Sequence, residues 1–212
     1  MVQTLLDNKA DVNAKSESYG IALQAASSKG HEKVVQMLLN NKADVNAKSK
    51  PYGIALQAAS SRGHEKVVQT LLINGANINA QCGYYGTALQ AASSGGHDKA
   101  VQMLLDNGAN INAQCEYYGT ALQVASSGGH DKAVQTLLNN GADINAQYGY
   151  HDTAWQEGSL GGYDGVEQML LDDGAIDDAQ GQGLDRGLYN TQEDYEYEMQ
   201  VDVPREDDVL LI

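Results

Sequence analysis

Residues 86–118 read GTALQAASSGGHDKAVQMLLDNGANINAQCEYY, and 26 of these 33 positions are identical in residues 119–151. The same step of 33 separates four histidines (His31, His64, His97 and His130) and six Leu-Leu pairs, which begin at residues 5, 38, 71, 104, 137 and 170. A fixed period of this length is the signature of a solenoid, in which each unit buries its apolar face against its neighbours. The period therefore predicts one repeated unit along most of the chain.

Each unit has the pattern of two short helices followed by a loop. Thr87 is a typical N-cap for a first helix over 88–94, which we expect to stop at Gly95-Gly96. A second helix begins near His97-Asp98, and its apolar residues recur at the spacing of one buried helical face. The pattern predicts an all-α fold of stacked helix pairs.

Glycines are expected to end the second helices in a left-handed conformation. They are Gly75, Gly108 and Gly141, whereas the earlier units carry Lys9 and Lys42 at the same position. A residue with a Cβ in that conformation is less stable than glycine. We therefore expect the first units to be the least stable part of the array.

The period of 33, the Gly-His step, the Leu-Leu pair and the sequence Gly-Ala-Asn/Asp-x-Asn at 108–112 and 141–145 resemble the ankyrin repeat. The resemblance extends from residue 1 to about residue 180. It implies an ankyrin-repeat solenoid with β-hairpin-like loops and a role in protein–protein recognition. The family's Thr-Pro-Leu-His stands here as Ile-Ala-Leu-Gln or Thr-Ala-Leu-Gln. The repeat sequence is most similar to those of the arrays at the C-terminal ends of fungal NLR-like proteins, which implies a ligand-sensing role.

The repeat pattern divides the chain into four parts. We expect a partial N-terminal repeat over 1–19, a four-repeat core over 20–146, a degenerate C-terminal capping repeat over 147–180, and an acidic, mostly disordered tail over 181–212. The partial repeat begins inside a second helix, so its leucines lack the first helix that would cover them. We expect self-association through this uncapped N-terminal edge.

Charge and composition exclude several classes of function. The net charge is −15, made up of +3 over 1–66, −3 over 67–146, −8 over 147–180 and −7 over 181–212. Binding to nucleic acids or anionic lipids needs clusters of Lys and Arg, so we expect neither partner. No apolar run is long enough to span a membrane, and no secretory signal opens the sequence. We expect a cytoplasmic protein with free thiols at Cys82 and Cys115, which lie one repeat apart.

The periodic histidines do not predict a metal site. Equivalent atoms of adjacent units are about 10 Å apart, whereas zinc ligands lie about 2 Å from the metal. We expect a structural role for all four, capping the start of each second helix. No nucleophile is paired with a base, and no phosphate-binding loop is present. We therefore expect no catalytic residue, no metal and no cofactor.

Partner binding is expected mainly on the loops, where the units differ. Tyr84, Tyr117 and Tyr150 replace Ser18 and Pro51, so we interpret them as an exposed binding row, with a solvated and partly packed row as the alternative. The tyrosines one position later in the unit are uniform, which favours packing. The first-helix surface is mostly Ala, Ser and Gly, and only Lys29 and Arg62 offer anchors there. The sequence thus predicts a non-catalytic protein-interaction scaffold, or alternatively a regulatory or targeting subunit of an enzyme.

Overall fold

The computed structural model describes residues 2–16, 20–49, 53–81, 86–115, 119–147 and 153–176. These residues belong to one structural unit, which ends at Ile176. The predicted binding row of Tyr84, Tyr117 and Tyr150 lies outside the described residues, as do Cys82 and the acidic tail.

The repeat containing residues 86–115 shows how the sequence produces the helix pair. Helix α6 (Ala88–Ser94) begins at Thr87, whose side-chain oxygen accepts the backbone N–H of Gln90 at 3.2 Å. A turn at Gly95-Gly96 leads into helix α7 (Asp98–Asp106), whose first turn holds Asp98, an acid favoured there by the helix dipole. These bounds agree with the helices predicted over 88–94 and from residues 97–98.

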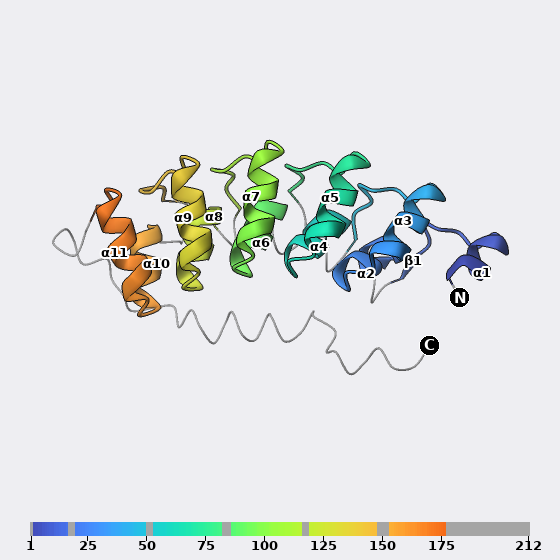
Figure 1. Ribbon diagram of the computed structural model, residues 1–212, viewed down its shortest axis with the longest axis horizontal. Coiled ribbons are helices and arrows are strands. Elements are labelled where there is room, and N and C mark those ends of the chain that lie inside the picture. Colours follow the sequence, from blue (N-terminus) through green and yellow to red (C-terminus); the bar gives the residue numbers. More distant parts are fainter. Residues whose placement is uncertain are drawn as a thin grey trace. The chain divides into compact units, whose positions relative to one another are not determined.

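The same pair recurs along the array (Figure 1). The first, or inner, helices are α2 (Ala22–Ser28), α4 (Ala55–Ser60), α6, α8 (Ala121–Ser127) and α10 (Ala154–Leu160). The second, or outer, helices are α3 (Glu32–Asn40), α5 (Glu65–Ile73), α7, α9 (Asp131–Asn139) and α11 (Asp164–Asp172), preceded by α1 (Val2–Asp7). The stacked helix pairs predicted from the period of 33 are confirmed, and their arrangement is the one that the resemblance implies.

The loops between repeats have short antiparallel pairings at their bases. Strand β1 (Lys15–Ser16) pairs with β2 (Gly20–Ile21), with Ser16 opposite Gly20. Isolated bridges join Ser49 to Gly53 and Cys115 to Gly119. Cys115 is a free thiol.

The core runs continuously between the stacked repeats. Each inner helix packs on the next inner helix, and each outer helix contacts the next outer helix. The first leucine of the outer-helix pair is fully buried in α5, α7, α9 and α11, as is the leucine of the inner helices α2, α4, α6 and α8. In α10, Trp155 takes the place of that leucine and is also buried. Small alanines on neighbouring inner helices allow this close packing.

The N-terminal edge is covered less well than the internal repeats. Helix α1 has no buried residue, and Leu5 is 54% exposed, whereas its equivalent Leu38 is 2% exposed. Ala22 is exposed, whereas its equivalent Ala55 is buried. Both differences arise because, within the described part of the chain, no inner helix lies beside α1.

No helix in the described residues is long and apolar enough to cross a membrane.

Candidate recognition surface

A buried glutamine joins each inner helix to the loop of the next repeat. Gln90 Oε1 accepts the backbone N–H of Thr87 at 2.8 Å, and its Nε2 donates to the carbonyl oxygens of Ala113 at 3.3 Å and Gly119 at 2.6 Å. Gln24, Gln57 and Gln123 bond in the same way to their own helix start and to the following loop. The glutamine of the Leu-Gln pair therefore bonds both within its repeat and between repeats.

The histidine at the start of each outer helix reaches the preceding repeat. His97 Nε2 lies 3.2 Å from the carbonyl oxygen of Ser61, and His64 and His130 make equivalent contacts with Ser28 at 3.1 Å and Ser94 at 2.9 Å. Since a carbonyl only accepts, Nε2 carries the proton in each case. These bonds fix the spacing of adjacent turns.

Glycine provides the space for the histidine ring. Gly63 has a φ of 65°, and a Cβ placed on it would lie 2.6 Å from Nδ1 of His97. Gly30 and Gly96 hold the rings of the next repeats in the same way, and Gly129 holds the ring of Tyr163. The Gly-His dipeptide of an internal repeat therefore serves two junctions. Its histidine packs on the glycine of the preceding repeat, and its glycine receives the ring of the next repeat.

The expected capping role of the histidines is not present. His31, His64, His97 and His130 are the N-cap residues of their outer helices, but none accepts a side-chain cap hydrogen bond from its own helix. In His64, His97 and His130 the ring lies over a glycine of the preceding repeat and Nε2 bonds to a carbonyl of that repeat, so the ring is directed away from its own helix. His31 is exposed, and the described residues contain no carbonyl equivalent to that of Ser61 for it to reach.

An asparagine in each loop bonds to the backbone of the next loop. Asn46 Oδ1 accepts the N–H of Asn77 at 2.7 Å, and Asn46 Nδ2 donates to the carbonyl oxygen of Gly75 at 3.1 Å. The side-chain oxygens of Asn13, Asn79, Asn112 and Asn145 likewise accept a backbone N–H of the next loop. The asparagine bonds and the inter-repeat bonds of the glutamines were not predicted from the sequence, although both residues recur at the same 33-residue step.

The glutamine and asparagine bonds recur at the four junctions between helix pairs, and the histidine contacts recur at three of them, so each repeat is bonded to its neighbours. A family model described as ankyrin repeats, in three copies, matches residues 1–82 and residues 55–148. The chain belongs to the ankyrin-repeat family. Ankyrin repeats mark this array as a protein–protein interaction module. No curated protein matches the chain.

The outer helices of the ankyrin array end in a left-handed residue. Gly75, Gly108 and Gly141 have φ values of 84°, 88° and 84°, and Lys9 and Lys42 occupy the same position with φ values of 63° and 68°. A Cβ added to Gly75 would meet nothing within 4 Å. The cost of a side chain here is therefore set by the backbone conformation alone.

Lys29 and Arg62 lie on the turns that follow the inner helices α2 and α4, and both are exposed. The following repeats carry Gly95 and Gly128 at this position. The carbonyl end of a helix favours a cation by about 0.3–1 kcal/mol, so Lys29 and Arg62 are suited to these turns. They are the two predicted binding residues that the described part of the chain contains.

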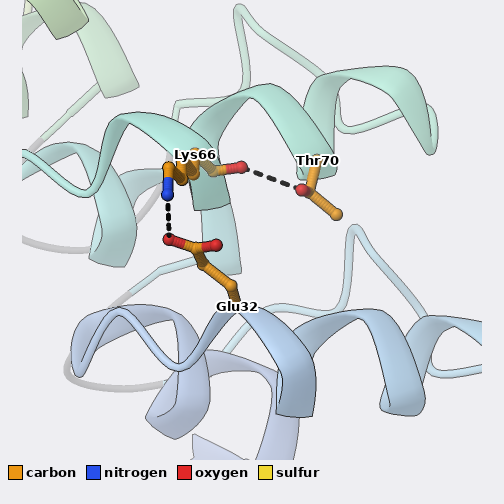
Figure 2. Close-up of polar contacts among 3 residues, drawn as sticks. All are labelled: Glu32, Lys66 and Thr70. Carbon is orange, nitrogen blue, oxygen red and sulfur yellow. Dashed lines mark hydrogen bonds and ion pairs between the residues drawn. The ribbon is translucent and has the colours of Figure 1, made fainter.

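Ion pairs link the outer helices on the exposed side of the array. Lys66 Nζ lies 3.4 Å from Glu32 Oε1, and Thr70 donates its hydroxyl to the carbonyl oxygen of Lys66 at 2.8 Å (Figure 2). Lys99 and Glu65 pair in the same way at 3.7 Å. The side chains of Lys66 and Glu32 are 81% and 49% exposed, so such a pair adds at most about 1 kcal/mol to stability.

Among the described residues, no group of three or more His, Cys, Asp or Glu side chains is placed to hold a metal ion. Each histidine ring is instead spaced from the next by a full repeat.

Proposed function

We propose that this ankyrin array recognises a protein partner without catalysing a reaction, through its loops and the turns that follow its inner helices. The proposal is supported by where the remaining side chains lie. The glutamines and asparagines of the junctions, with His64, His97 and His130, are used to hold repeats together. Lys29 and Arg62 lie on exposed turns. We propose that Tyr84, Tyr117 and Tyr150 share their binding role, as the aromatic anchors of the loops.

The finer role that we propose is ligand sensing, as the end of a fungal NLR-like protein in the cytoplasm. The repeat sequence Tyr-Gly-x-Ala-Leu-Gln-Ala-Ala-Ser supports this role. The exposed N-terminal edge around Leu5 supports self-association there. The rival function is a regulatory or targeting subunit of an enzyme, which needs the same binding surface.

The deciding experiment is a pulldown with the full chain from cell extract, repeated with Tyr84, Tyr117 and Tyr150 changed to Ala. Loss of a partner only in the triple variant supports loop recognition. Tyr117→Ala alone should weaken that partner by roughly 1–2 kcal/mol and leave the melting temperature unchanged. A melting temperature that falls sharply while affinity is kept would show that the row packs rather than binds. Retention of one enzyme whose rate then changes would favour the regulatory subunit.

A further inference from the structure

We propose that the turns of the first two complete repeats bind an acidic protein segment, and that Lys29, Lys33 and Arg62 form its docking patch. The inference rests on the proposed function and gives the chemistry of the partner. We call these three residues the basic turn patch. Lys33 is the second residue of α3, and all three side chains are exposed.

Lys29 and Arg62 lie on two turns that touch, and Lys33 lies in the first turn of the helix that follows Lys29. His64 Nε2 lies 3.1 Å from the carbonyl oxygen of Ser28, the residue before Lys29, and Arg62 is two residues before His64. A Cβ on Gly30 would lie 2.7 Å from the same ring. The positions of Lys29 and Arg62 are therefore fixed relative to each other by the junction between the repeats.

The charges around the patch do not cancel. Glu32 and Glu65, the acids nearest in sequence, pair with Lys66 and Lys99. Within the residues that the structure describes, neither Lys29, Lys33 nor Arg62 takes part in an ion pair. Two neighbouring turns and the start of α3 thus carry three cations that can meet carboxylates, while Glu32 and Glu65 are already paired.

The fold does not require a long side chain at these turns. At Gly95 an added Cβ would lie 2.5 Å from Nε2 of His97, and at Gly128 it would lie 2.6 Å from Nε2 of His130. Glycine therefore fits this turn, and with Arg62 at the same position His64 still makes its contact with Ser28 at 3.1 Å. Because the later repeats fold with glycine here, the packing of the array does not require the charged side chains of Lys29 and Arg62.

The geometry favours a carboxylate at every third residue of the partner. Adjacent repeats are spaced by about 10 Å, and an extended chain advances about 3.3 Å per residue. Carboxylates three residues apart therefore match one repeat step, and the Arg62 guanidinium offers a bidentate partner for one of them. Nucleic acid fits less well, because three cations on a chain of net charge −15 neutralise few phosphates.

The test uses the full chain and a fluorescein-labelled peptide with Glu at every third position and Gly and Ser between. Binding is followed by fluorescence anisotropy in about 10 mM salt, where charges act over about 30 Å. Lys29→Gly with Arg62→Gly installs the residue that the later repeats use, and should weaken binding about tenfold. The matched control Lys132→Gln removes an exposed lysine of α9 and should leave binding unchanged.

Several results would overturn the proposal. They are no binding at about 1 mM peptide, equal binding by the double variant, or a lowered melting temperature with unchanged affinity, which would make the two cations helix-end stabilisers only. An oligonucleotide of equal charge that binds more tightly through the same residues would reassign the patch to nucleic acid. A pulldown partner that binds the double variant as well as it binds the wild type would contradict this inference without affecting the proposed function.

Discussion

The ring of His97 lies over Gly63 of the preceding repeat, and its Nε2 donates to the carbonyl oxygen of Ser61 at 3.2 Å. Each such contact crosses a junction, so it stabilises two repeats together. His97→Ala should lower the free energy of unfolding by about 1–3 kcal/mol, because the carbonyl and the space over Gly63 lose their partner. Urea unfolding measures this, with His31→Ala as the control. Equal losses in the two variants would show that the contact with Ser61 does not matter.

The buried amide of Gln90 should matter more than the histidine, because it serves three backbone groups. Gln90→Ala leaves the N–H of Thr87 and the carbonyl oxygens of Ala113 and Gly119 without that partner. We expect a loss of about 2–4 kcal/mol in the free energy of unfolding, seen by chemical denaturation. Gln102→Ala on α7, whose amide bonds to Asp106, should cost less than about 0.5 kcal/mol. A loss at Gln90 as small as that at Gln102 would contradict this account.

Lys42 should be improved by glycine. Its φ of 68° costs a non-glycine residue about 1 kcal/mol, so Lys42→Gly should raise stability by about that amount. The reciprocal change Gly75→Lys should lower it by a similar amount, because the space there is open and only the backbone is strained. Unchanged urea-unfolding midpoints in both variants would mean that the left-handed conformation has no free-energy cost for lysine here.

The repeats that contain Lys9 and Lys42 should open first. Amide hydrogen exchange should be faster over residues 2–49 than over 86–147, since α1 has no buried residue and Leu5 is exposed. Slower exchange in the first segment would refute the prediction. It would also point to a cover over the N-terminal edge, such as a second copy.

A serine of the inner helices is buried without using its hydroxyl. Ser60 Oγ has no hydrogen-bond partner, whereas the equivalent Ser126 donates to the carbonyl oxygen of Leu122 at 2.9 Å. Ser60→Ala should therefore stabilise the array by up to about 1 kcal/mol in thermal or urea unfolding. Ser126→Ala should bring no such gain, and the opposite ranking would show that Ser60 is bonded in solution.

The repeat, the helix pair and the left-handed positions can all be predicted from local sequence features. Thr87 and Gly95 bound helix α6 through local capping and backbone preferences, and Lys42 and Gly75 end their helices through φ alone, so neighbouring residues suffice to predict them. The atoms that meet across a junction, by contrast, depend on how the repeats pack. His97 bonds to a carbonyl 36 residues earlier, and Gln90 bonds to one 29 residues later. A period of 33 predicts that such residues are neighbours. The direction of a hydrogen bond, however, depends on how one repeat is set against the next, and that placement follows from the packing of the buried leucines and alanines.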